Sequence, residues 1–256
     1  MVISDSRFGC WSRLVPTVFV SHQTNILMPP SLKWLEPFIN FFNRLQIKKF
    51  TVCWIPDFPS HRITGNLTKT YDLNVRFIGM LSRFDKSISQ PIKKYDYLIL
   101  ISGPEPQRTV FEELMRDALH KIPGKKIMVK GQPQLSDKII ETDGFEEVGH
   151  LRSDQLQKVI VESEFIFSRS GYTTVMDLAV LKKKVFFVPT PGQTEQEELA
   201  AELEKRKIAF YQHQHDFDFE VALYNSINYT GFTNFAHDSQ LLQNAMTELL
   251  TSSSNV

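Results

Sequence analysis

The sequence predicts an α/β protein in which parallel β-sheets are flanked by helices. The main observation is the order strand, helix, strand, helix across residues 165–198. Its two apolar runs, at residues 165–167 and 185–188, suit strands that are buried on both faces of a parallel sheet. A second observation is that strand-like apolar runs occur on either side of a polar segment at residues 85–94. The sequence therefore predicts two lobes, at residues 1–90 and 91–256.

The first lobe is expected to be a sheet of short strands that end in polar residues. Strands are predicted at residues 2–3, 17–20, 51–55 and 75–79. Because α/β sheets bind ligands at the carboxyl ends of their strands, Asp5 and His22 are candidate catalytic residues. His22 could act as a base or bind an acceptor, since imidazole titrates near neutrality. The alternatives are a structural, hydrogen-bonded His22 and a simple ion pair between Asp5 and Arg7.

An aromatic-rich helix is predicted at residues 32–45. Its apolar positions 35, 38, 39 and 42 form one stripe, and positions 34, 41 and 45 widen that stripe beyond a single contact face. We favour a helix buried between the sheet and another element, because basic residues occur only near its ends, at Lys33 and Arg44. The other interpretation is an interfacial helix that contacts a membrane.

The second lobe is expected to contain one parallel sheet flanked by helices. Strands are predicted at residues 97–101, 126–130, 145–148, 165–167, 185–188 and 208–211. Helices are predicted at residues 109–120, 153–162, 173–181, 193–207 and 238–250. The loops that follow the strands should lie at one edge of the sheet, where this class of fold places its ligands.

The chemistry of these loops points to a phosphorylated sugar compound. Ser170 and Gly171 form a turn before a helix, whose backbone N–H groups and positive dipole favour phosphate. Asp177 follows within two helical turns and could accept hydrogen bonds from the vicinal hydroxyls of a ribose. Three residues after a Pro-Gly bend suit sugar hydroxyls: Gln193, Glu195 and Gln196. Taken singly, each feature also fits an ordinary turn, a solvated carboxylate or a helix cap.

Together, the segments SRSGYTTVMDL (residues 168–178) and PTPGQTEQ (residues 189–196) resemble a known family. They are similar to the C-terminal nucleotide-sugar-binding domain of GT-B glycosyltransferases, in particular the MurG-like group (glycosyltransferase family 28). The resemblance covers residues 96–211 well and the preceding part more loosely. It implies two Rossmann-like lobes, with the first incomplete, because the group's glycine-rich Gly-x-Gly-His loop is absent from the sequence.

The resemblance also implies a role for each residue of the donor site. Asp177 would hold the ribose hydroxyls, and Gln193 and Gln196 would contact the donor sugar. The other implied donor-site residues are Ser102, Gly103, His150, Leu151, Ser170, Gly171, Tyr172, Thr173, Thr174 and Glu195. The chain departs from the group in having Asp177 for a glutamate and Gln196–Glu197 for a pair of glutamines. It also has Pro104 after Gly103, which removes one backbone donor.

Composition excludes several other classes of function. The 29 basic and 29 acidic residues cancel, so no overall field favours nucleic acid. Two cysteines cannot form a disulfide framework, and the alternating His213 and His215 lack a third ligand for a metal. Because the sequence shows neither a signal peptide nor a membrane-spanning run, we expect a cytoplasmic protein. A lipid-linked acceptor would place it at the inner face of the membrane.

The function implied by the resemblance is glycosyl transfer from a UDP-sugar. The sugar is expected to be of the GlcNAc type and the acceptor is unknown; the reaction would be inverting and independent of metal. The UDP-sugar is the donor substrate, and no cofactor is expected. One alternative is a non-catalytic nucleotide-sugar-binding protein, or a half-enzyme whose partner supplies the missing N-terminal part. A UDP-GlcNAc 2-epimerase shares the fold but is disfavoured by the PTPGQTEQ segment.

Overall fold

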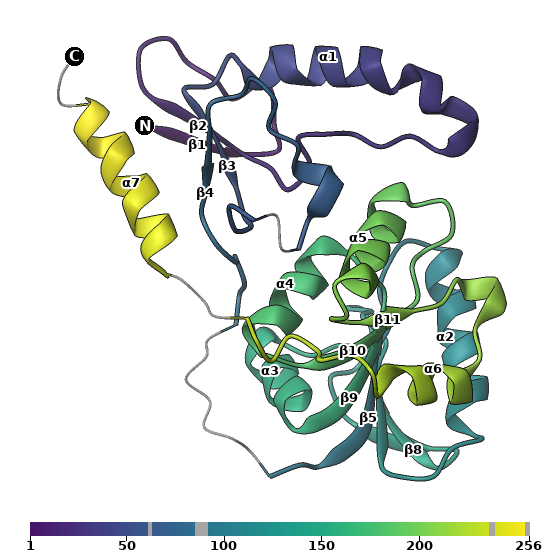
Figure 1. Ribbon diagram of the computed structural model, residues 1–256. Coiled ribbons are helices and arrows are strands. Elements are labelled where there is room, and N and C mark those ends of the chain that lie inside the picture. Colours follow the sequence, from purple (N-terminus) through teal and green to yellow (C-terminus); the bar gives the residue numbers. More distant parts are fainter. Residues whose placement is uncertain (61–62, 85–91, 236–238, 254–256) are drawn as a thin grey trace. The chain divides into compact units, whose positions relative to one another are not determined.

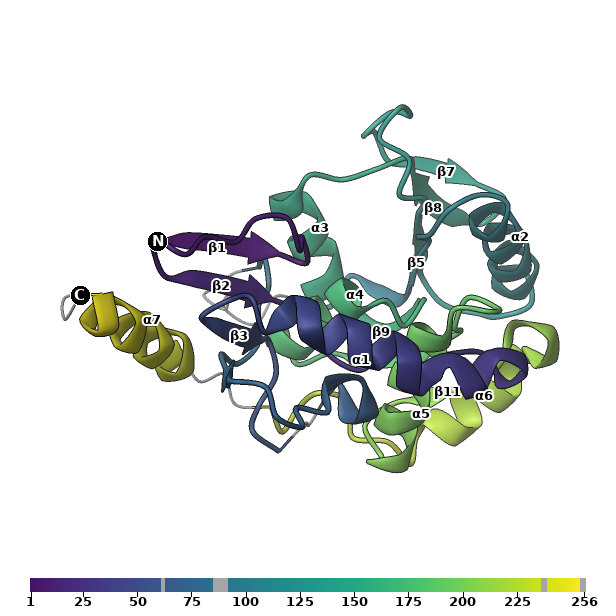
Figure 2. The ribbon, with the colours of Figure 1, turned by 90° about the horizontal axis from the view of Figure 1, so that it is seen from above.

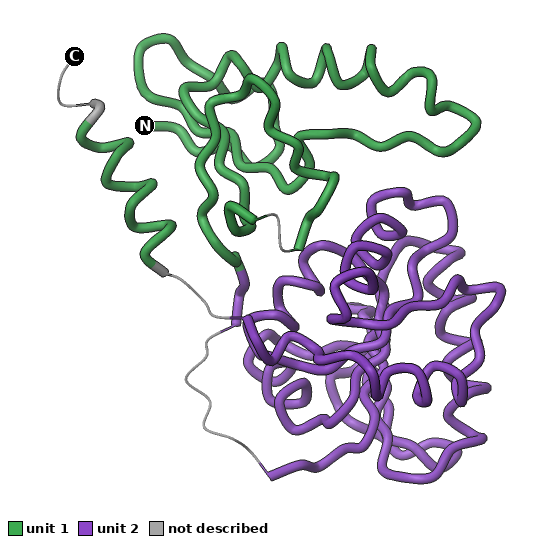
Figure 3. Tube along the Cα trace, viewed as in Figure 1, with its two compact units in different colours: residues 1–81, 236–256 green, residues 82–235 purple. Residues whose placement is uncertain are grey.

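The chain folds into two compact units (Figures 1 and 3). A computed structural model describes residues 1–256 except 61–62, 85–91, 236–238 and 254–256. The first unit comprises residues 1–81 and 236–256, and the second comprises residues 82–235. The division after residue 81 differs from the expected boundary at residue 90. The larger difference is that the C-terminal helix belongs to the first unit, although the sequence placed it in the second lobe.

The first unit is built on a four-stranded parallel sheet in the order β1-β2-β3-β4. Its strands are β1 (Val2–Asp5), β2 (Thr17–Val20), β3 (Val52–Ile55) and β4 (Val75–Phe77). Side chains alternate along the two central strands. Val18 and Trp54 pack with Leu249 of the C-terminal helix α7 (Ser239–Ser253), whereas Phe19 and Cys53 pack with other residues. The helix α7 therefore completes the core of this unit.

The buried side of the aromatic helix is not the aromatic side that we favoured. Helix α1 (Glu36–Ile47) follows a short 3₁₀ helix (Pro30–Leu35), and it buries Asn40 and Asn43. Asn40 accepts from Ile26 N at 2.7 Å and donates to Ile26 O at 2.9 Å, and Asn43 donates to Thr24 O at 2.9 Å. These amides satisfy the backbone of a segment that forms no strand.

The large apolar side chains of the aromatic helix are consequently exposed. They are Leu32, Trp34, Phe38, Phe41, Phe42 and Leu45. The interpretation of this helix as one buried on its aromatic face is therefore wrong. The polar asparagines occupy the buried side, and only Ile47 among its large apolar residues is fully buried.

The second unit contains a seven-stranded sheet in the order β11-β10-β9-β5-β6-β8-β7. Its strands are β5 (Tyr95–Leu100), β6 (Lys126–Val129), β7 (Ile140–Thr142), β8 (Phe145–Val148), β9 (Ser163–Ser168), β10 (Lys184–Phe187) and β11 (Phe210–Tyr211). Every neighbouring pair is parallel except β7 with β8. The predicted α/β class, with a parallel sheet flanked by helices, is confirmed.

Helices cover both faces of this sheet. They are α2 (Gln107–Leu119), α3 (Ser153–Val161), α4 (Tyr172–Val180), α5 (Thr194–Lys205) and α6 (Phe219–Ser226). Helices α2 and α6 share one core with the sheet, where Phe111 and Phe219 pack with Phe167 of β9. Helices α3 and α4 lie on the opposite face (Figures 1 and 2). None of the helices in the described residues is both long and apolar enough to cross a bilayer.

Candidate functional site

The order of the strands defines a ligand-binding position in the second unit. The chain proceeds from β5 to β6 and β8 on one side, and from β9 to β10 and β11 on the other. The direction therefore reverses between the neighbours β5 and β9, and open α/β sheets bind ligands beside such a point, at the carboxyl ends of the strands. The loops that leave these two strands carry Ser102–Gly103 and Ser170–Gly171.

Both glycines of these loops border open space. A Cβ atom added to Gly103 or Gly171 would meet no heavy atom within 4 Å. Gly103 has a φ of +108°, a conformation that side chains disfavour, so the chain there requires glycine. The residues predicted to approach the diphosphate thus flank the position where the strand order reverses, and space beside them is free of protein atoms.

The start of α4 presents the positive end of a helix dipole to this loop. Gly171 is the N-cap residue, and no side chain caps the helix. The hydroxyl of Ser170 does not serve as a cap, because it is buried and donates to Gln196 O at 2.8 Å. The predicted residues Tyr172, Thr173 and Thr174 form the first turn. An anion is the favoured ligand at such a helix start.

The predicted sugar-contacting residues come together beside Ser170. Gln196 accepts from Thr190 N at 2.9 Å through its Oε1, and its Nε2 donates to Gln193 Oε1 at 2.5 Å. Because Ser170 also bonds to the backbone of Gln196, the loops after β9 and β10 are tied to each other. Glu195 lies between these two glutamines in the sequence, in the first turn of α5, and it is half-buried.

Asp177 is engaged by residues that sequence analysis did not select. Its Oδ1 accepts from Ser82 Oγ at 2.6 Å, and its Oδ2 accepts from Arg83 Nε at 3.1 Å. The carboxyl group is only 3% exposed. Burial raises its pKa, and the contacts with Ser82 and Arg83 oppose that rise. No bond described here joins Asp177 to Ser170 or Gln196, so its role at the ribose stays a prediction.

The remaining predicted donor residues lie in two other loops at the same edge. Ser102 is half-buried two residues after β5. His150 and Leu151 follow β8 and are half-buried, and His150 Nδ1 lies 3.1 Å from Leu135 O. Their assignment to a uracil ring is consistent with this position and stays a prediction.

A buried arginine, Arg169, was also missed by the sequence analysis. It is 1% exposed, and its Nη1 donates to Val188 O and Pro189 O, both at 3.0 Å. Its Nη2 donates to Gln107 O at 3.0 Å and to Gln214 Oε1 at 2.5 Å. The residue was overlooked because its partners lie 19 to 62 positions away in the sequence.

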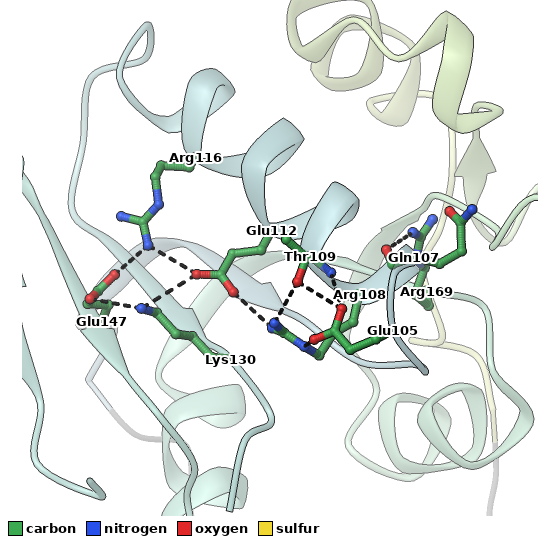
Figure 4. Close-up of polar contacts among 9 residues, drawn as sticks. All are labelled: Glu105, Gln107, Arg108, Thr109, Glu112, Arg116, Lys130, Glu147 and Arg169. Carbon is green, nitrogen blue, oxygen red and sulfur yellow. Dashed lines mark hydrogen bonds and ion pairs between the residues drawn. The ribbon is translucent and has the colours of Figure 1, made fainter. Parts of the chain in front are cut away.

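Charged side chains on α2 form a network that borders the same edge (Figure 4). Arg108 contacts Glu105 at 2.6 Å and Glu112 at 2.8 Å, and Arg116 contacts Glu147 at 2.7 Å. Lys130 joins Glu147 at 3.0 Å and Glu112 at 3.5 Å. The three cations and three carboxylates balance, so this network fixes α2 to the ends of β6 and β8 and leaves no charge for a ligand.

The predicted catalytic residues belong to the first unit. Asp5 ends β1, is exposed and accepts from Ser6 Oγ at 3.4 Å, and His22 is half-buried two residues after β2. Their catalytic roles remain predictions. Asp57, two residues after β3, accepts from Thr64 N at 2.9 Å and Phe58 N at 2.7 Å. Asp57 is fully buried, so it orders its own loop.

The histidines near the end of the second unit stack on each other. The ring centroids of His213 and His215 are 5.7 Å apart, and His215 Nε2 lies 3.0 Å from Asp216 Oδ2. Within the described part of the chain, no three His, Cys, Asp or Glu residues are placed to hold a metal ion.

Comparison with known proteins gives one family match and several similar folds. Residues 110–229 match the model of the glycosyltransferase family 28 C-terminal domain. The crystal structure of MurG from Acinetobacter baumannii matches at 18% identity with a TM-score of 0.53, covering 94% of this chain and 67% of that chain. The kitacinnamycin glycotransferase matches at 11% identity with a TM-score of 0.55, covering 92% and 67%. No curated protein sequence matches the chain.

Two further structures of similar fold contain nucleotides. The spinosyn rhamnosyltransferase SpnG, complexed with thymidine diphosphate, matches at 12% identity with a TM-score of 0.54 and covers 92% of this chain and 64% of that chain. The Arabidopsis thaliana protein UGT89C1, complexed with UDP-L-rhamnose, matches at 9% identity with a TM-score of 0.53 and covers 93% and 61%. The chain therefore spans about two thirds of the length of these structures and has the predicted GT-B fold.

Proposed function

Because residues 110–229 match the model of the glycosyltransferase family 28 C-terminal domain and the chain has a MurG-like GT-B fold, we propose that this protein binds a nucleoside-diphosphate sugar for sugar transfer. The observation that carries the proposal is the pair of glycine loops beside the reversal of strand order, at Gly103 and Gly171. The nucleotides bound to SpnG and UGT89C1 support a nucleoside diphosphate as the ligand class.

The donor would be held by residues of the second unit. Its diphosphate would lie against Gly171 and the start of α4, where the backbone and the helix dipole stabilise negative charge. Gln193 and Gln196 would bind sugar hydroxyls, and His150 and Leu151 would flank a uracil. A GlcNAc-type sugar on UDP is the specific donor that we propose, on the resemblance of the loop sequences.

Asp177 would bind the ribose while it stays in contact with Ser82 and Arg83. An ionised carboxylate offers about four acceptor positions; the side chains of Ser82 and Arg83 use two of them, and the backbone N–H of Arg83 contacts the group as well. The ribose hydroxyls would take the others. Arg83 also favours the ionised form, which is the form that accepts hydrogen bonds from a ribose.

In the proposed reaction the acceptor hydroxyl attacks the anomeric carbon and the nucleoside diphosphate leaves, with inversion. A base of the first unit, His22 or Asp5, would take the proton of the hydroxyl. The charge that develops on the leaving diphosphate would be stabilised by the preorganised start of α4, without a metal ion. A lipid-linked acceptor is the one that we propose, because α1 exposes an aromatic face suited to a membrane surface.

A second candidate is nucleotide-sugar binding without turnover by this chain alone. The chain spans 61–67% of the length of the similar structures quoted above. A partner would then supply further catalytic residues. Incubation with UDP-GlcNAc and a set of acceptors would separate the two, since the second candidate predicts binding without release of UDP. A new UDP-sugar formed without any acceptor would instead indicate epimerisation.

The proposal is tested by binding of UDP to a variant that fills the space beside Gly171. Gly171→Val adds carbon atoms where no protein atom lies within 4 Å of a Cβ, and its φ of −66° suits valine. We expect an unchanged melting temperature and a loss of UDP affinity of roughly tenfold or more by calorimetry, the cost of overpacking a filled site.

Gly9→Val is the matched control, because Gly9 also borders open space but lies in the first unit. It should bind UDP as the wild type does. Wild-type protein whose melting temperature rises with none of UDP, GDP and dTDP or their sugars would contradict the proposed function, because a ligand of the native state raises that temperature.

A further inference from the structure

Arg169 is a buried cation whose described partners carry no charge. Its guanidinium bonds to three backbone carbonyls and to the side-chain amide of Gln214. Arg108, the other buried arginine of this unit, instead contacts the carboxylates of Glu105 and Glu112. A buried charge is costly unless it is compensated, so the surroundings of Arg169 favour a nearby anion.

The same guanidinium connects three loops of the proposed donor site. Arg169 itself directly precedes Ser170 in the loop after β9. Its partners Val188 and Pro189 begin the loop after β10, and Gln107 is the first residue of α2, after the Gly103 loop. The guanidinium carbon of Arg169 lies 4.1 Å from the centroid of the Phe111 ring. In Figure 4, Arg169 contacts Gln107 apart from the balanced charge network of α2.

Unused hydrogen-bonding capacity lies in the same region. Within the described residues, Arg169 Nε and Thr190 Oγ1 are buried polar atoms without a hydrogen-bond partner. Thr190 follows Pro189, which accepts from Arg169, and its N–H donates to the side chain of Gln196. Most buried polar groups in proteins are satisfied, so these two unpaired atoms leave the polarity around Arg169 incompletely compensated beside the donor loops.

We propose that Arg169 is a positioning residue for the diphosphate of the donor. It fixes the three loops through its hydrogen bonds, and its uncompensated charge favours the phosphates over the nucleoside. The side chain is too buried to touch the donor, so it acts through the Ser170–Gly171 turn. Burial lowers its pKa to about 10, and the group is still protonated at neutral pH. This inference rests on the proposed function and specifies which part of the donor is recognised.

The decisive variant compensates the charge and keeps the hydrogen bond. Gln214→Glu places a carboxylate oxygen where Gln214 Oε1 now accepts from Arg169 Nη2, and it gives up only the longer bond from Gln214 Nε2 to Gln107 Oε1 at 3.4 Å. The loops should stay connected, and the melting temperature should not fall. We expect the affinity for UDP to drop roughly tenfold, as for one added charge near the site, while the affinity for uridine stays within about twofold of wild type.

Gln212→Glu is the matched control, because it adds the same charge two residues earlier. The Gln212 side chain accepts from Asp218 N at 3.1 Å, so its carboxylate would not replace a partner of Arg169. We expect this variant to keep the wild-type ratio of UDP to uridine affinity. Titration calorimetry with uridine, UMP and UDP at low and high KCl measures the ratio for all three proteins.

The outcomes distinguish this inference from the proposed function. A Gln214→Glu protein that retains the wild-type ratio of UDP to uridine affinity, with or without an equal loss of both, overturns the role of Arg169. The proposed donor site is unaffected by that result. Wild-type protein that binds none of UDP, GDP and dTDP or their sugars overturns the proposed function itself. If Gln214→Glu does not fold, Arg169→Lys decides: it keeps the charge, so its UDP to uridine ratio should exceed that of Arg169→Met.

Discussion

At the scale of single residues, Asp177 links burial to ligand binding. Asp177 is almost completely buried, and burial raises the pKa of its carboxyl group above the ordinary value of an aspartate. Asp177→Asn should lower UDP affinity roughly tenfold to a hundredfold, because a hydrogen bond to a charged group contributes about 1.5–3 kcal/mol. Calorimetry of the variant measures this loss. Wild-type affinity in Asp177→Asn would show that the ribose is bound elsewhere.

The raised pKa also gives binding a pH dependence of known sign. Because the pKa of Asp177 is raised in the folded protein, its carboxylate binds a proton at a higher pH than it does in the unfolded chain. Protonation of Asp177 on acidification therefore does not lower the free energy of unfolding. Acidification does, however, protonate the carboxylate that would accept hydrogen bonds from the ribose. UDP affinity of the wild type should therefore fall as the pH is lowered, and Asp177→Asn should not show this fall. Titrations between pH 4 and pH 8 test both statements.

Arg83 should determine the pH at which the affinity for UDP falls. Its guanidinium opposes the effect of burial on the pKa of Asp177. In Arg83→Ala the pKa of Asp177 should rise further, and UDP affinity should be lost at a higher pH than in the wild type. Arg83→Lys, which keeps the charge, should restore most of the wild-type profile. An Arg83→Ala profile that coincides with the wild-type profile would contradict this.

At the level of residues, a sequence indicates which side chains can meet only where their contacts are local. Gln193 and Gln196 are three positions apart and their side chains meet, as turn and helix spacing allows. Ser82 and Asp177 are 95 positions apart, and no local pattern connects them. The same holds for Arg169, whose role depends on three loops that only the folded sheet brings together.

At the scale of elements, α1 shows that periodicity alone does not identify the buried side of a helix. The predicted stripe is divided between the 3₁₀ helix, which carries positions 34 and 35, and α1, which carries positions 38 to 45. Which side is buried is decided by Asn40 and Asn43, whose amides satisfy backbone groups of residues 24–26. Two asparagines on a helix do not indicate in the sequence that they will bond to buried backbone groups, because asparagine is also common on solvated faces.

The exposed aromatic face of α1 should bind membranes that contain anionic lipid. Phe38 and Phe42 are each 62% exposed, and Arg44 lies on the same helix. We expect the wild type to sediment with phosphatidylglycerol vesicles and the double variant Phe38→Ser with Phe42→Ser to lose most of this binding. Its stability should change little, as for other surface substitutions.

Tyr224→Ser is the control for that experiment, because Tyr224 is an exposed aromatic residue of α6 in the second unit. It should sediment as the wild type does. Wild-type protein that stays in the supernatant with anionic vesicles would remove the membrane interpretation and leave the aromatic face to a protein partner.

At the scale of the whole molecule, the sequence predicted the fold class but not the path of the chain. Each strand–helix–strand unit is a local pattern, so the parallel sheet of the second unit followed from residues 95–211. Helix α7 has apolar positions such as Ala245 and Leu249 that would fit any apolar face. Only the structure shows that these positions pack on Val18 and Trp54 of the first unit.

The distribution of tryptophan allows the two units to be followed separately. All three tryptophans, Trp11, Trp34 and Trp54, lie in the first unit. Leu249→Ala removes a buried side chain that packs in one cluster with Trp54, and such a change costs about 2–5 kcal/mol. The transition observed by tryptophan fluorescence should move to a lower denaturant concentration.

UDP should act on the other unit. All residues that we assign to the donor lie between Ser102 and Gln196, within the second unit, which has no tryptophan. Because a ligand stabilises the unit that binds it, by about 2.7 kcal/mol at a concentration 100 times its Kd, UDP should raise the transition followed by far-ultraviolet circular dichroism. The tryptophan transition should stay in place. If UDP shifted the tryptophan transition alone, the donor residues would have to be sought in the first unit.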